Sequence, residues 1–202
     1  MYRKPVNKVL NILSDISLSC NNYILLAEKN IQEFSKKSII CLDTDVKENR
    51  IKNLKSIILL PGEIPPDQLI FEFLYNLQDN DGIWTNAIHY TKAVFNNSTN
   101  AIRQDLSITG QQINLKNVLK DYYESNSDTT KPRESFKKFY KAKDFQDFLK
   151  QKENPWKHWI DKNQDVCDEF IEKFTNMVIR IMKQEYDINE AKLSFLKKGD
   201  KK

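Results

Sequence analysis

Two short, continuous apolar runs constrain the fold of this chain more than any other feature. They are SIICL at residues 38–42 and SIILL at residues 56–60, joined by a charged segment at residues 46–55. Uninterrupted apolar runs rich in β-branched residues are typical of strands that are covered on both faces. The runs therefore predict two adjacent parallel strands of an α/β sheet, although the connection is short for a full helical crossover.

Most of the remaining sequence has the periodicity of helices. Apolar side chains recur every three or four residues at 6–16 and 21–34, before the first apolar run. Pro65-Pro66 is well placed to open a helix, because proline costs nothing in the first turn, and an apolar stripe follows it. Further helical patterns lie at residues 83–95, 133–140, 144–152 and 166–186, whereas residues 96–111 are polar and either irregular or weakly helical.

The fold class that follows is α/β, with a partial parallel sheet and an appended, mainly helical C-terminal region. A chain of 202 residues is long enough to bury a sizeable core. We expect the α/β part at residues 1–80 and the helical region at residues 81–202. A loop is expected near residues 124–131, where the sequence is ESNSDTTK.

Composition excludes several classes of protein. With 32 Lys and Arg against 28 Asp and Glu, the net charge of +4 is too small to indicate a nucleic-acid-binding protein by itself. The 4 glycines are too far apart for a Walker-type phosphate loop or a dinucleotide-binding fingerprint. The 3 cysteines include no C-x-x-C pair and suggest neither a disulfide framework nor a zinc site. No apolar run approaches the length of a membrane helix, so we expect a cytoplasmic protein that does not bind membranes.

Asp43-x-Asp45 is the most informative polar feature. It directly follows the first apolar run, and ligands bind at the carboxyl ends of strands in open α/β sheets. Two carboxylates at this spacing can hold Mg²⁺, which takes few carboxylates together with waters and substrate phosphates. The alternative is that Asp43 caps the following turn while Asp45 is solvated, since a bare D-x-D pattern is common.

The segments KKSIICLDTDV and IILLPGEIPPDQLIFEFL resemble the topoisomerase–primase (TOPRIM) domain found at the C-terminal end of ATPases of the overcoming-lysogenization-defect (OLD) kind. In that family an apolar strand ends in D-x-D, and in one branch the next strand runs into L-P-G and a proline pair with a nearby acid. The resemblance covers residues 21–77, and residues 133–174 are similar to the helical tail of the same proteins.

The resemblance implies Mg²⁺- or Mn²⁺-dependent cleavage of nucleic acid in bacterial defence against phage, with DNA favoured over RNA and the choice left open. It also implies an ABC-type ATPase, present as an upstream domain or a partner subunit, and assembly into a homo-oligomer. The family's first strand, with a glutamate commonly in a V-E-G sequence, has no counterpart before Asp43. We therefore expect a C-terminal fragment or a split subunit whose nuclease activity needs residues from elsewhere, or else a site that has become degenerate.

The resemblance also extends the expected site beyond the D-x-D. The family's further acid corresponds to Glu63 or Asp67, and the alternative role of Asp67 is favourable charge at a helix N-terminus. A lysine near the scissile phosphate corresponds to Lys137 or Lys138, for which a solvated helix face is the alternative. The expected metal ligands are Asp43, Asp45 and Asp67, and the expected catalytic residues are Asp43, Asp45, Glu63, Asp67 and Lys137.

The remaining patterns and the two alternative functions lead to further interpretations. Aromatic and cationic residues alternate over residues 136–143, as in surfaces that bind single strands, although aromatics at this spacing also form core stripes. Trp156 and Trp159 are expected to pack in the interior, and His158 has no acidic partner at a useful spacing. In place of a nuclease, the chain could be a TOPRIM-like docking or regulatory module for an ATPase or effector. If the two strands prove false, a mainly helical interaction protein remains.

Overall fold

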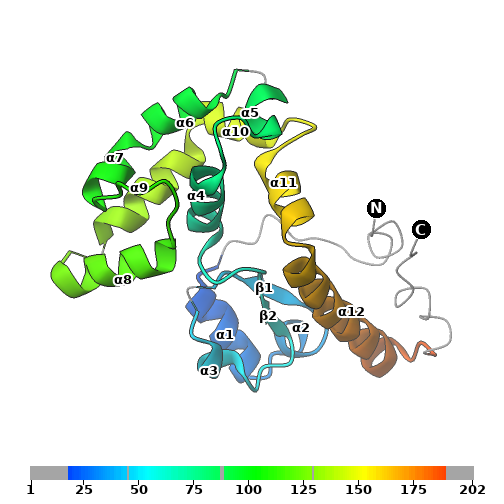
Figure 1. Ribbon diagram of the computed structural model, residues 1–202. Helices are drawn as coiled ribbons and strands as arrows, with labels where there is room; N and C mark the ends of the chain where they lie inside the picture. The colour runs from blue at the N-terminus through cyan, green and yellow to red at the C-terminus, as the bar shows by residue number, and fades with distance from the viewer. Residues whose placement is uncertain (1–17, 45, 87–88, 129, 190–202) are drawn as a thin grey trace. The chain divides into compact units, whose positions relative to one another are not determined.

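The computed structural model describes residues 18–44, 46–86, 89–128 and 130–189, and the helix expected at 6–16 lies outside them (Figure 1). The chain forms two compact units. The first, called here the α/β unit, comprises Met1–Pro61 and Asp165–Lys202, and the second, the helical unit, comprises Gly62–Gln164. The boundaries of these two units differ from those of the expected parts, residues 1–80 and 81–202.

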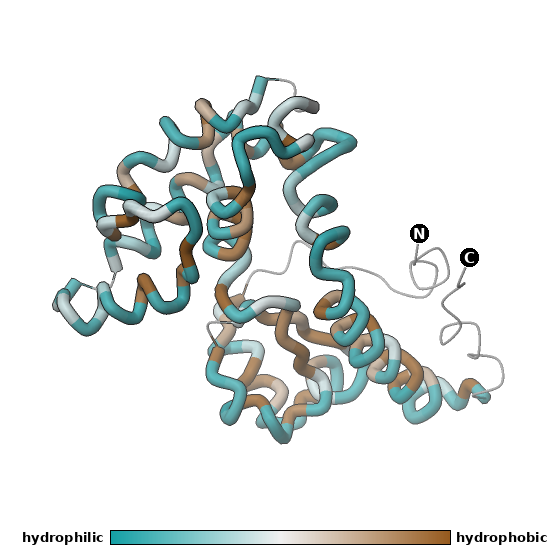
Figure 2. Tube along the Cα trace, in the orientation of Figure 1, coloured by the Kyte–Doolittle hydropathy of each residue, from teal (hydrophilic) through white to brown (hydrophobic). Residues whose placement is uncertain are grey.

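A parallel pair of strands lies at the centre of the α/β unit. Strand β1 (Ile40–Leu42) pairs in parallel with strand β2 (Ile57–Leu59). The short helix α3 (Glu48–Ile51) lies in the connection between them. Figure 2 shows both strands among the strongly hydrophobic segments of this unit. The prediction of adjacent parallel strands, and with it an α/β arrangement, is confirmed, although Ile39 precedes β1.

Helices α1 (Cys20–Glu28) and α2 (Gln32–Ser35) precede the sheet. The single helix expected over residues 21–34 is divided because Asn30 has a φ of 54°, in the left-handed region where a helix cannot continue. Apolar side chains from α1, α3 and both strands form one core, which removes apolar surface from water. Its members are Ile24, Ala27, Ile40, Leu42, Ile51 and Ile57.

The last helix, α12 (Gln164–Tyr186), belongs to the same unit. Arg180 donates a hydrogen bond from Nη2 to the Lys55 carbonyl oxygen at 2.5 Å. The predicted apolar stripe is only partly correct, because Val166 is 37% exposed while Val178 and Ile179 are buried. Apolar residues occupy more than one side of α12, so helical spacing alone does not identify the covered side.

Eight helices form the helical unit within its described residues. The predicted helix after Pro65 is confirmed as α4, with proline in its first turn, and the segment 83–95 is divided into α5 and α6. Within the described part of the chain, no helix combines the length and the apolar surface that crossing a bilayer requires. The helices are α4 (Pro66–Asn76), α5 (Gly82–Asn86), α6 (Lys92–Ser98), α7 (Asn100–Asp105), α8 (Leu115–Ser125), α9 (Thr130–Lys141), α10 (Lys143–Leu149) and α11 (Pro155–Lys162).

Phe71 of α4 is at the centre of the aromatic core of this unit. Its ring centroid lies 5.9 Å from that of Phe95, 5.1 Å from that of Phe136 and 6.1 Å from that of Phe139. All four side chains are buried. Two of the aromatic residues at 136–143, which the sequence left open as part of a binding surface, are therefore core residues. Their contacts with Phe71 pack α9 against α4.

Replacing Phe71 by alanine should lower the free energy of unfolding of the helical unit by about 3–5 kcal/mol, because it removes a fully buried ring and leaves a cavity. Urea denaturation followed by tryptophan fluorescence measures this loss, since Trp84, Trp156 and Trp159 all lie in this unit. Ile160→Ala is the control, because Ile160 is 40% exposed. Equal losses for the two variants would contradict the central position of Phe71.

Candidate functional site

Asp43 lies directly after β1, at the carboxyl end of the parallel strand pair. Its side chain is partly buried, and the Cys20 thiol of α1 donates to Asp43 Oδ1 at a distance of 3.6 Å. The neighbouring Thr44 hydroxyl oxygen is buried and has no hydrogen-bond partner within the described structure. Asp45 lies outside the described residues. This edge of the sheet therefore presents a carboxylate and an unpartnered hydroxyl.

The expected three-carboxylate site includes Asp45, which lies outside the described residues. Among residues 18–44, 46–86, 89–128 and 130–189, no three His, Cys, Asp or Glu side chains are close enough to hold a metal ion. Asp43 belongs to the α/β unit, whereas Asp67 belongs to the helical unit. The grouping of Asp43, Asp45 and Asp67 around one ion stays a prediction.

Glu63 lies before α4 and is exposed. The Lys116 ammonium of α8 donates to Glu63 Oε2 at 2.9 Å, and this hydrogen bond, with the lysine charge, lowers the pKa of Glu63. Exposed ion pairs of this kind contribute little to stability because water screens them. The structure thus gives Glu63 a surface partner.

Asp67 occupies the first turn of α4, as the sequence predicted. Its Oδ1 accepts a hydrogen bond from the Gln68 backbone N–H at 3.1 Å, which fits an acid at a helix N-terminus. Burial raises the pKa of Asp67, and this hydrogen bond and the charges of Lys137 and Arg133 on α9 oppose the rise. Asp67 and Lys137 are thus electrostatic neighbours within the helical unit, and Lys137 Nζ also lies 3.3 Å from Glu134 Oε1.

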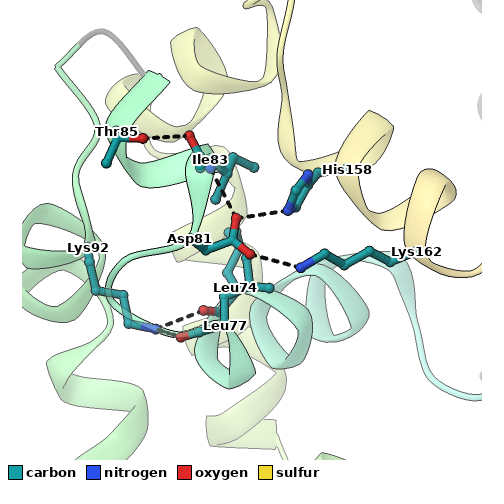
Figure 3. A network of polar contacts seen from close by, with 9 residues as sticks. Leu74, Leu77, Asp81, Ile83, Thr85, Lys92, His158 and Lys162 are labelled. Atoms are coloured by element: carbon teal, nitrogen blue, oxygen red, sulfur yellow. Dashed lines mark hydrogen bonds and ion pairs between the residues drawn. The ribbon is translucent and has the colours of Figure 1, made fainter.

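Asp81 is at the centre of a polar network that joins the turn after α4 to α11 (Figure 3). Its Oδ1 accepts a hydrogen bond from the Ile83 N–H at 3.0 Å and lies 2.9 Å from His158 Nε2. Its Oδ2 accepts from Lys162 Nζ at 2.8 Å. His158 thus has an acidic partner, which comes from a distant part of the sequence and therefore does not lie at a useful sequence spacing. The spacing of His158 and Lys162 on one helical face was the available signal.

The electrostatics of Asp81 favour its ionised form. Burial is the largest influence and acts to raise its pKa, but Lys162, the Ile83 N–H and His158 together outweigh burial, so the pKa of Asp81 is lowered. The Thr85 hydroxyl donates a hydrogen bond to the Gly82 carbonyl oxygen at 3.1 Å. The network therefore holds α11 against the turn. Among the described residues it includes no nucleophile that His158 could activate.

Lys92 holds the same turn from another side (Figure 3). Its Nζ donates to the carbonyl oxygens of Leu74 at 3.0 Å, Tyr75 at 3.0 Å and Leu77 at 2.8 Å. A cation at this position satisfies carbonyl groups that the end of α4 leaves unpaired. Lys92 Nζ also lies 5.1 Å from the centroid of the Trp84 ring. Burial lowers the pKa of Lys92, and its role is structural.

Asp81→Asn should reduce the stability of the helical unit at neutral pH. The variant should also lose less stability than the parent when the pH is lowered. A carboxyl group whose pKa is lowered on folding contributes stability above its unfolded pKa, and this contribution is lost as the pH falls through the folded pKa. Melting temperatures of the parent and the variant, measured from about pH 6 to about pH 3, should therefore converge on acidification. Asp121→Asn, at an exposed acid of α8, is the control, and parallel curves for the parent and Asp81→Asn would refute this role.

Comparisons with protein-family models, with curated proteins and with solved structures return no match. The function of the chain is therefore inferred from the chemistry of its own residues. The feature with the most chemical content is the carboxyl edge of the β1 and β2 pair, where Asp43 and Thr44 lie.

Proposed function

We propose that this chain is the TOPRIM-like, metal-dependent nuclease portion of an ATP-dependent phage-defence protein. The observation that supports the proposal is the position of Asp43, directly after a strand of a parallel pair. In open α/β sheets, ligands bind at the carboxyl ends of the strands. Asp43 and Asp45 are proposed to bind Mg²⁺ or Mn²⁺ at this edge.

The donor atoms at the edge suit a hard divalent cation. Asp43 contributes a partly buried carboxylate, and the buried Thr44 hydroxyl has no partner among the described residues. Asp45 adds a second carboxylate from its place in the sequence. Mg²⁺ prefers such oxygen ligands and retains several waters. When bound, ions of this kind supply an activated water and stabilise the leaving oxygen of a phosphodiester.

The chain's own residues prepare the site by orientation. The thiol of Cys20, a weak donor, lies 3.6 Å from Asp43 Oδ1 and contacts that carboxylate from α1. The Leu60 N–H donates to the Leu42 carbonyl oxygen at 2.8 Å and continues the pairing up to the strand end. The base of the site is thus the hydrogen-bonded end of a paired strand, and sites built on such elements hold their groups in a more defined geometry than sites on loops.

The proposed nuclease acts with partners. An ABC-type ATPase, as a domain or a subunit, is proposed to supply the phosphate-binding loop that the 4 dispersed glycines cannot form. Assembly into a homo-oligomer is part of the same proposal. The isolated chain is expected to show little or no ATPase activity and weak nuclease activity at most.

A second candidate function is that of a TOPRIM-like docking or regulatory module for an ATPase or effector. Two observations favour it. No three ligand side chains gather within the described structure, and the Asp43 carboxylate already accepts a contact from Cys20. In this case the strand pair serves as a scaffold, and nucleic-acid cleavage belongs to other chains.

The test is the melting temperature of the chain with and without Mg²⁺ or Mn²⁺. A ligand at about ten times its dissociation constant stabilises the native state by about 1.4 kcal/mol, or roughly 3–6 °C for a chain of this size. Asp43→Asn should abolish most of this shift. Glu172→Gln, at an exposed acid of α12, should keep it.

Asp67→Asn tests the remaining predicted ligand with the same measurement. A smaller metal-induced shift adds Asp67 to the site, and an unchanged shift leaves it as an acid at the start of α4. A parent melting temperature that does not change with millimolar metal would contradict metal binding and favour the docking module. Metal-dependent nicking of plasmid DNA with the ATPase partner present, compared between the parent and Asp43→Ala, then tests the activity.

A further inference from the structure

Helix α9 separates its side chains into an aromatic inner face and a cationic outer face. Phe136 and Phe139 are buried, at 0% and 3% exposed. The cations recur at a spacing of three or four residues and so follow one side of the helix. We call them the α9 cationic face: Arg133, Lys137, Lys138 and Lys141.

The positive charge of this face is only partly compensated. Helix α9 contains five cations and one acid, Glu134, in the sequence TKPRESFKKFYK. Glu134 pairs with Lys137 at 3.3 Å, and Lys131 pairs with Asp105 of α7 at 2.7 Å. Lys138 and Lys141 are exposed and form no ion pair with a described residue. A concentrated positive surface of this kind attracts polyanions.

A groove in the same unit offers apolar contact. It has a volume of about 420 Å³ and is lined by Ile64, Lys116, Leu119, Lys120, Tyr123 and Glu124. The side chain of Tyr123 is 37% exposed, so part of its ring is open to a ligand. Burial raises the pKa of Tyr123, and the charge of Arg133 opposes the rise, so this cation of α9 is an electrostatic neighbour of Tyr123.

We propose that the α9 cationic face and this groove bind single-stranded nucleic acid. Lys138 and Lys141 contact backbone phosphates, and a base enters the groove and stacks on Tyr123. Bases in a duplex are paired and stacked and cannot enter such a groove, so the unpaired form is preferred. This inference specifies single-stranded nucleic acid as the substrate of the proposed nuclease, and in that respect it rests on the proposed function. Binding to this surface itself needs no metal ion.

The experiment is fluorescence anisotropy of the full chain in EDTA. The probes are labelled oligo-dT and oligo-rU of about 20 nucleotides, and a duplex DNA of the same length. The parent should bind the single strands more tightly than the duplex, with affinity falling as salt rises. The tighter of the two single strands identifies DNA or RNA as the preferred chemistry.

Matched variants separate the two parts of the surface. Lys138→Gln with Lys141→Gln should weaken single-strand binding at least about tenfold and reduce the salt slope by about 1.4, for two lost phosphate contacts. Tyr123→Ala should weaken binding roughly fivefold or more, and Tyr123→Phe should restore it. Lys36→Gln with Lys37→Gln is the control, because both lysines are exposed in the α/β unit.

Several outcomes would overturn this inference. They are no binding by the parent, equal affinity for the duplex, an unchanged affinity of the Lys138 and Lys141 variant, or tighter binding to phosphatidylserine vesicles than to the single strands. Asp43→Asn should bind the oligomers as the parent does, because EDTA removes the metal. If the parent binds the oligomers but shows no metal-induced melting shift, the proposed nuclease site alone is refuted. If the parent shows the melting shift but does not bind the oligomers, this surface alone is refuted.

Discussion

Parallel pairing of β1 with β2 is the constraint on which the placement of polar groups in the α/β unit depends. Two parallel strands end at the same edge of their sheet, so the residues that follow each strand are brought to that edge. The pairing register places Cys41 opposite Ile58, with Ile40 and Leu42 buried and Cys41 exposed. A shift by one residue would expose the buried pair, so the core determines the register, and the register determines where Asp43 lies.

Features that depend on a few neighbouring residues could be predicted from the sequence. Both strands follow from uninterrupted apolar runs, and α4 follows from a proline pair and an apolar stripe. The break at Asn30 also had a local signal, because asparagine is one of the few residues that adopt the left-handed conformation directly after a helix end. Helix α8 did have a local signal, since the Asn114 side chain accepts a hydrogen bond from the Asn117 N–H.

Features that depend on distant residues could not be predicted in the same way. The pair of Asp81 and His158 exists only because α11 packs beside the turn after α4. Similarly, the alternation of aromatics and cations in α9 is compatible with a core or with a surface. The contact of Phe71 with Phe136 shows that the aromatic side of α9 belongs to the core. For the candidate site, the sequence identifies Asp43 as a carboxylate at a strand end, while a third ligand depends on tertiary structure.

The α/β unit is built from two stretches of chain, with the whole helical unit, Gly62–Gln164, between them. During synthesis, β1 and β2 therefore leave the ribosome before α12, which supplies Val178 and Ile179 to the interior of their unit. At about 5–20 residues per second, the intervening segment takes roughly 5–20 s to make. For that time the nascent strands lack their last helix, and their apolar surface is open to chaperones and to aggregation. The order of elements along the chain thus means that the α/β unit completes its fold only after the helical unit has been synthesised.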